Sequence, residues 1–184
     1  MPLPQEKYYT VEDFYNMPDD IRAELIHGQI VYMASPNRLH QDISHELDFA
    51  ITSHIKSKGG KCRVYTAPFG VQLHEGDDTV LEPDISVVCD TDKLTARGCT
   101  GAPDWIIEIV SPSNPIHDYI TKLELYHSAH VREYWIVDAQ SGQVHVYNME
   151  SGSFTTRTYS FTDTVKAGIF EDLYIDFSSL DFGS

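Results

Sequence analysis

The sequence predicts a single α/β domain, and three observations carry this prediction. Short apolar segments typical of buried strands alternate along the chain with two segments of helical periodicity. The chain has 184 residues, 41% of them hydrophobic and 11% aromatic, which is enough for one core and too apolar for a disordered chain. No internal repeat, low-complexity stretch or Gly/Ser linker divides it, so we expect residues 1–184 to form one domain.

The N-terminal region is predicted to hold a short helix and a pair of strands. Thr10 begins the helical segment TVEDFYNM, Asp13 stands in the position of a capping-box acid, and Pro18 ends the segment. The segment ELIHGQIVYMA, residues 24–34, predicts two strands that turn at residues 27–28.

A long amphipathic helix and three strands are expected next. The apolar residues of the helix recur at spacings of three and four, and Gly59 is a suitable stop. The residues on this apolar face are Leu39, Ile43, Leu47, Ala50, Ile51 and Ile55. Strands are predicted in CRVYTA, which starts at Cys62, in FGVQL, which starts at Phe69, and in VLEPDISVV, residues 80–88. Pro83 inside the last of these implies an edge position or a local bend.

The second half of the chain predicts further strands and one helix. WIIEIV is a buried strand closed by SPSN, and the pair Asn114 and Pro115 opens a helix that runs to about Ala129. EYWIVD is another apolar strand, and QVHVYNM and SFTTRTYS form a predicted hairpin around Glu150. The stretch IFEDLYIDFSSL is a short strand or an irregular tail.

Composition limits the functional classes. The chain has 13 basic and 28 acidic side chains and a formal charge of −15, which counts against extended binding to duplex DNA but is compatible with a local basic groove. Cys62, Cys89 and Cys99 lack CxxC spacing, so we predict no disulfide framework or zinc site and expect the first two to be buried hydrophobes. No apolar run approaches the roughly 20 residues of a membrane helix, and no signal-peptide core is present, so we expect a cytoplasmic protein.

Two predicted strands each carry one acid among apolar residues. These are Asp84, which follows Pro83, and Glu108, in the middle of WIIEIV. A carboxylate taken out of water has to be neutralised, paired or bound to a metal. If the two strands are neighbours, the carboxylates converge and suit Mg²⁺ or Mn²⁺, which prefer oxygen ligands. Two separate salt-bridged strand ends explain the residues equally well.

The predicted helix after SPSN adds a cation to this pattern. Asp118, Lys122 and Tyr126 are spaced by four and lie on one helical face. A lysine aimed at two carboxylates could stabilise a developing anion or orient an attacking water. The alternative is a solvated Asp–Lys pair of the kind found on any exposed helix.

The ordered motifs resemble the Uma-two family of endonucleases, which belongs to the PD-(D/E)XK restriction-endonuclease-like superfamily. The resemblance runs from about Tyr9 to Asp138 and is carried by EPDISVV, WIIEIVSPSN and DYITKLELYHSAHVREYWIVD. The N-terminal YTVEDFYNMP and AELIHGQIVYMASPNRLHQDISHEL are also similar to that family. It implies a restriction-endonuclease-like central mixed sheet flanked by helices, and a metal-dependent endonuclease.

The resemblance also implies roles for four residues. Asp84 matches the metal-binding aspartate of the superfamily motif and Glu108 its second acid, so these two would bind Mg²⁺ or Mn²⁺. Val110 stands where the superfamily has its lysine, and Lys122 on the following helix takes that role. Glu24 in AELIHG matches a further acid near the site. The catalytic set is therefore Glu24, Asp84, Glu108 and Lys122.

Three histidines are compared with the family pattern. His27 stands where the family more often has Asp, and His130 stands where it usually has Gly, a residue that supports positive φ. His40 matches a family histidine, and we favour a structural or peripheral role for it over a role in the site.

The expected function is metal-dependent hydrolysis of phosphodiester bonds in nucleic acid, with DNA as the favoured substrate. Two alternatives stay open: a non-catalytic binding module on the same scaffold, and a hydrolase of a small phosphodiester. The sequence does not determine the oligomeric state, and a homodimer is one of the states that it allows. No membrane partner is predicted.

Overall fold

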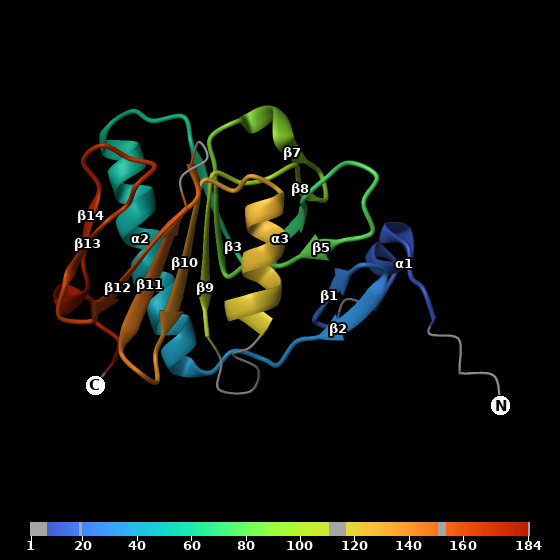
Figure 1. Cartoon of the computed structure of the whole chain (residues 1–184), viewed down its shortest axis with the longest axis horizontal. Helices are drawn as coiled ribbons and strands as arrows, with labels where there is room; N and C mark the ends of the chain where they lie inside the picture. The colour runs from blue at the N-terminus through green and yellow to red at the C-terminus, as the bar shows by residue number, and fades with distance from the viewer. Residues whose placement is uncertain (1–6, 19, 111–116, 151–153, 184) are drawn as a thin grey trace.

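The computed structural model of the chain describes residues 7–18, 20–110, 117–150 and 154–183 (Figure 1). The strands are β1 (Ala23–Ile26), β2 (Gln29–Tyr32), β3 (Arg63–Thr66), β4 (Gly70–Gln72), β5 (Val80–Leu81), β6 (Ile85–Val88), β7 (Leu94–Thr95), β8 (Gly98–Thr100), β9 (Trp105–Ile109), β10 (Glu133–Asp138), β11 (Gln143–Asn148), β12 (Thr155–Ser160), β13 (Thr164–Lys166) and β14 (Tyr174–Asp176). The helical segments are α1 (Val11–Tyr15), α2 (Arg38–Ser57), α3 (Leu123–Ser128), the π-helical segment η2 (His117–Lys122), and the 3₁₀ turns η1 (Thr91–Lys93) and η4 (Phe177–Ser179).

Most of the strands belong to two larger sheets. The central sheet has the order β12-β11-β10-β9-β6-β3, and the second sheet has the order β2-β1-β5-β4-β8-β7. In the central sheet β9 and β10 run parallel, whereas β6 is antiparallel to β9, so the sheet is mixed. A separate pair, β13 and β14, lies beside them. This architecture confirms the predicted α/β class and the predicted central mixed sheet.

The two faces of the central sheet are covered by different elements. Trp105, Ile107 and Trp135 belong to a core that also contains the buried face of α2. The alternate residues Ile106 and Ile136 belong to a second core, which contains α3 and strands of the second sheet. Figure 1 shows α2 and α3 on opposite sides of the central sheet. Helices on both faces are therefore confirmed, while the second sheet on the α3 face was not predicted.

Several local features follow directly from sequence chemistry. Thr10 and Asp13 form the predicted capping box at the start of α1. The hairpin of β1 and β2 turns at His27 and Gly28, whose φ angles of 49° and 73° are the positive values that tight hairpin turns require. The predicted apolar face of α2 is buried at four positions, and these are Ile43, Leu47, Ile51 and Ile55.

The prediction of one strand over residues 80–88 is wrong. The segment forms two strands, β5 in the second sheet and β6 in the central sheet. The chain crosses between the sheets around Pro83, which has no N–H to donate to a strand neighbour. Asp84 is therefore at the entry to β6, where its carbonyl accepts the Ala67 N–H at 3.1 Å.

The prediction of no disulfide is also wrong, because Cys62 and Cys89 are bonded to each other. Arg63 of β3 lies opposite Val88 of β6 in an antiparallel pair, so Cys62, just before β3, lies opposite Cys89, just after β6. The two Cα atoms are 3.9 Å apart. The cysteines are 27 positions apart along the chain, so their pairing depends on strand register, which motif spacing does not contain.

The C-terminal half agrees with the sequence where the structure describes it. β11 and β12 form the predicted hairpin, although residues 151–153 of its turn lie outside the described residues. The predicted helix opening at Asn114 and Pro115 also lies outside them, and the described helix runs through η2 and α3 to Ser128. β7 and β8 were not predicted. No helix in the described part of the chain is both long and apolar enough to cross a membrane.

Candidate active site

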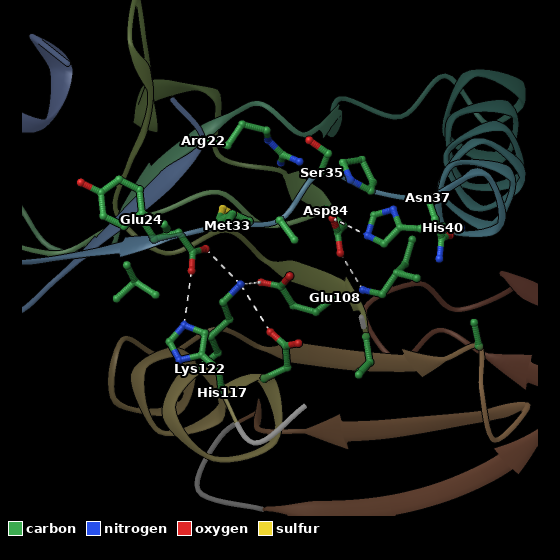
Figure 2. A pocket seen from close by; sticks show the side chains of 18 of the residues that line it. Arg22, Glu24, Met33, Ser35, Asn37, His40, Asp84, Glu108, His117 and Lys122 are labelled. Carbon is green, nitrogen blue, oxygen red and sulfur yellow. Dashed lines mark hydrogen bonds and ion pairs between the residues drawn. The ribbon is translucent and has the colours of Figure 1, made fainter. Parts of the chain in front are cut away.

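A pocket of about 260 Å³ opens where the two sheets meet the start of α2 and the segment η2 (Figure 2). Its wall includes the β1–β2 hairpin and the chain around Asn37, at the N-terminus of α2. All four residues predicted to be catalytic line it, and these are Glu24, Asp84, Glu108 and Lys122. They come from four segments that are far apart in the sequence, so the fold brings the predicted set together.

Asp84 and Glu108 are held side by side by strand register. Ile85 of β6 pairs with Ile107 of β9, so in this antiparallel pair Asp84 and Glu108 are the next opposed positions. Asp84 Oδ2 accepts the Ile109 N–H at 2.7 Å, which fixes its carboxylate against β9. Both residues are more than 90% buried, and both line the pocket.

Lys122 lies at the centre of an acidic cluster. Its Nζ is 2.9 Å from Glu108 Oε1, 3.0 Å from Glu24 Oε1 and 3.5 Å from Asp118 Oδ1. Tyr126, one helical turn further on, donates its hydroxyl hydrogen to Glu108 Oε1 at 2.7 Å. The Asp118, Lys122 and Tyr126 face predicted from the sequence is therefore turned inward, and the solvated-pair alternative does not describe Lys122, which is 2% exposed.

Two histidines contact the acids from outside this cluster. His40 Nε2 is 3.1 Å from Asp84 Oδ1, and His117 Nε2 is 3.4 Å from Glu24 Oε2. His40 thus lines the pocket and contacts a predicted metal ligand, and whether its role there is structural, as favoured from the sequence, stays a prediction. His117 was missed, although it directly precedes Asp118 on the predicted helix.

Arg22 also lines the pocket and was missed by the sequence reasoning. Residues two apart in an extended chain face the same side, and Arg22 stands two residues before Glu24. That alternation is a signal in the sequence that could have identified it.

The pKa values of the two glutamates of the cluster are shifted in opposite directions. Burial alone would raise the pKa of Glu24, but the Lys122 charge and hydrogen bonds from His117 and the Glu82 N–H lower that pKa to about 2. Burial raises the pKa of Glu108 well above its usual range; the Lys122 charge opposes this shift, and the charges of the neighbouring acids add to it. One ammonium therefore does not neutralise the whole cluster.

The pKa values of Lys122 and Asp118 are also shifted by this cluster. Burial disfavours a charged ammonium, yet the carboxylates of Glu108, Glu24 and Asp118 raise the pKa of Lys122 well above its usual range. Burial raises the pKa of Asp118, and Lys122 opposes that shift. The cluster consequently holds a charged lysine among acids that compete for it.

The donor atoms fit a hard divalent cation. Among the described residues no group of three His, Cys, Asp or Glu side chains is arranged to hold a metal ion. Mg²⁺, however, commonly binds through one or two carboxylates and keeps several waters or substrate oxygens. Asp84 and Glu108 supply two such carboxylates beside an excess of negative charge.

Comparisons with known proteins show the family and the fold of the chain. The Uma2 family, described as "Putative restriction endonuclease", matches residues 11–178 of the chain. The protein slr1290 of Synechocystis sp., described as uncharacterized, is 26% identical over 147 residues, which cover 79% of this chain and 76% of that protein.

A crystal structure from Anabaena variabilis, described as a putative nuclease belonging to DUF820, has a similar fold. Its TM-score is 0.74 at 23% identity, over 93% of this chain and 96% of the other. The structural match confirms the predicted restriction-endonuclease-like fold, and the family match confirms the resemblance that the motifs predicted.

Proposed function

The chain belongs to the Uma2 family of restriction-endonuclease-like proteins, and from this premise we propose that it hydrolyses phosphodiester bonds of nucleic acid with Mg²⁺ or Mn²⁺. The observation that carries the proposal is the pocket in which Asp84 and Glu108 lie opposite each other across β6 and β9. The excess of acids over the single Lys122 supports a divalent cation as the missing positive charge.

Each residue of the site has a proposed role. Asp84 and Glu108 would hold the cation, which supplies an activated water and offsets charge on the phosphate. His40 and the Ile109 N–H fix the carboxylate of Asp84. Lys122 would stabilise negative charge that develops on the phosphate.

Glu24 and Tyr126 hold the cluster from either side. Glu24 accepts the Glu82 N–H at 3.0 Å and contacts Lys122, so it aims the ammonium toward the pocket. The Tyr126 hydroxyl restrains Glu108 through the same oxygen that Lys122 contacts. These contacts reduce the freedom of the reacting groups before substrate binds.

The test is cleavage of plasmid, single-stranded DNA and RNA by the purified protein in Mg²⁺ or Mn²⁺. We expect cleavage that EDTA abolishes. Glu108→Gln should lower the rate by at least about a hundredfold, since it removes one of two proposed metal ligands. Glu171→Gln, which makes the same chemical change at an exposed position outside the pocket, should leave the rate unchanged.

The two variants are purified in parallel so that contaminating nucleases appear equally in both. Equal residual cleavage by Glu108→Gln and Glu171→Gln would mean that the activity is not the protein's own. Binding of nucleic acid without metal-dependent cleavage by the wild type would instead support a binding module on this scaffold.

A further inference from the structure

A second pocket adjoins the first on the other side of Asp84. Its volume is about 380 Å³, and it lies between the N-terminal turns of α2 and the chain that follows β3. Four residues line both pockets, and these are Arg22, Pro36, His40 and Asp84. The proposed metal ligand Asp84 is therefore at the boundary of two cavities and not at the end of one.

Arg22 is positioned at this boundary by the β1–β2 hairpin. Its carbonyl accepts the Met33 N–H at 2.9 Å, which continues the strand pairing by one residue. Its side chain shares a side of the strand with Glu24, and Figure 2 shows both along the wall of the pocket, with Arg22 near Ser35. Glu24 is buried, whereas Arg22 is half-buried, so Arg22 is the more accessible of the two to solvent.

Arg22 differs from Lys122 in its charge partners. The Lys122 ammonium contacts three carboxylates. Arg22 makes no ion pair within 4.0 Å to any described residue of the chain. A guanidinium presents a rigid fork of N–H donors that matches two phosphate oxygens. The N–H donors of the Arg22 guanidinium are therefore available to bind two oxygens of a phosphate.

We propose that Arg22 binds the phosphate of an internal phosphodiester in a single strand, whose two flanking nucleotides occupy the two pockets. The inference rests on the proposed function and adds the substrate class to it. Two adjacent cavities of small-ligand size suit two unpaired nucleotides. The net charge of −15 disfavours the extended phosphate contacts that duplex binding uses.

The experiment measures binding and not cleavage. Fluorescence anisotropy with a short labelled single-stranded DNA and its duplex is recorded in Mg²⁺, on a Glu108→Gln background in which cleavage should be at least about a hundredfold slower. Arg22→Gln and Arg157→Gln are added separately to this background. Arg157 is exposed on β12 and lines neither pocket, so both changes remove one positive charge but only the first removes the proposed contact.

Arg22→Gln should weaken single-strand binding about tenfold, the usual effect of losing a hydrogen bond to a charged group. The slope of log affinity against log salt should fall by about 0.7, as expected for one lost phosphate contact on a single strand. Arg157→Gln should change neither. Arg22→Lys keeps the charge and the salt slope but loses the fork, so its affinity should lie between those of the parent and Arg22→Gln.

The outcomes separate the inference from the proposed function. If the parent binds and Arg22→Gln matches Arg157→Gln, the assignment of Arg22 is overturned and the proposed function stands. Tighter binding of the duplex than of the single strand overturns the substrate class. An Arg22→Gln variant that fails to melt cooperatively is replaced by Arg22→Lys, for which parent-like affinity overturns the bidentate contact. If the wild type neither binds nucleic acid in EDTA nor cleaves it in Mg²⁺, the proposed function itself is overturned.

Discussion

At the scale of single residues, the charges of Lys122 and Glu108 have different effects on the stability of the fold, although the two side chains contact each other. Lys122 is a buried cation shared by three carboxylates. Glu108 is one of several acids around a single cation, and its raised pKa reports that its ionisation is disfavoured in the folded protein. Removing the cation should therefore destabilise the fold far more than removing the charge of this one acid.

We predict that Lys122→Met lowers the free energy of unfolding by about 3–5 kcal/mol near neutral pH, because it leaves buried carboxylates uncompensated. Glu108→Gln should be at least as stable as the wild type without metal, since a Gln oxygen can still accept from Lys122 and Tyr126. Urea unfolding in EDTA measures both, with Lys56→Met, an exposed change on α2, as the control.

The pH dependence of this difference has a defined sign. A carboxyl group whose pKa is raised on folding stabilises the protein below its unfolded value of 4.5, and that stability is lost as pH rises through the folded pKa. Glu108→Gln should therefore gain on the wild type as pH increases above about 4.5. A strongly destabilised Glu108→Gln variant at neutral pH would show instead that Glu108 serves mainly as the ion-pair partner of Lys122.

The candidate residues were largely predictable at this scale, and their contacts were not. Acids inside apolar strands stand out in a sequence because burial of a charge requires a partner, so Asp84 and Glu108 could be identified. His40 and Arg22 line the same pockets as Asp84 because the chain crosses from one sheet to the other just before Asp84. The spacing of residues in the sequence does not predict that these side chains lie beside Asp84.

At the scale of elements, the end of α3 is closed by a residue in a conformation that favours glycine. His130 has φ of 64°. Its N–H donates to the His127 carbonyl at 3.1 Å, and the Val131 N–H donates to the Tyr126 carbonyl at 3.0 Å. This pair of bonds is a Schellman motif, and the resemblance to a family that usually has Gly here agrees with it.

We predict that His130→Gly raises the free energy of unfolding by about 1 kcal/mol, because the left-handed conformation strains any residue with a Cβ. His127→Gly makes the same change three residues earlier, inside α3, and should lower stability by roughly 0.5 kcal/mol. Urea melts of both variants measure the contrast. Equal destabilisation by the two substitutions would contradict the assigned strain.

Elements with strong periodicity were predicted well, and assignments between elements were not. The apolar spacing of α2 determines its buried face whatever it packs against. The strands β4 and β5 look like any apolar strand, so the sequence does not state that they join a second sheet. Pro83 signalled an interruption, but a bend and a crossing between sheets give the same local signal.

At the scale of the whole molecule, metal binding should stabilise the fold. A cation that binds the native state and not the unfolded chain raises stability by mass action. At a Mn²⁺ concentration about a hundredfold above the dissociation constant, we expect the melting temperature to rise by about 5–10 °C.

Thermal melts in EDTA and in Mn²⁺ measure this shift, with Ca²⁺ as a second cation. Glu108→Gln should gain little from Mn²⁺, whereas Glu171→Gln, with the same loss of charge at an exposed position, should respond like the wild type. An equal shift in both variants would point to a general effect of cations on a protein of charge −15 and not to the pocket.

The bond between Cys62 and Cys89 has a topological consequence for this architecture. Between these residues the chain leaves the central sheet, contributes β4 and β5 to the second sheet, and returns through Asp84. The crosslink closes that excursion into a covalent ring. A backbone cut in the loop between β4 and β5 would therefore leave two polypeptides that stay joined, and the two sheets that frame the pocket would still be tethered at the strand that carries Asp84.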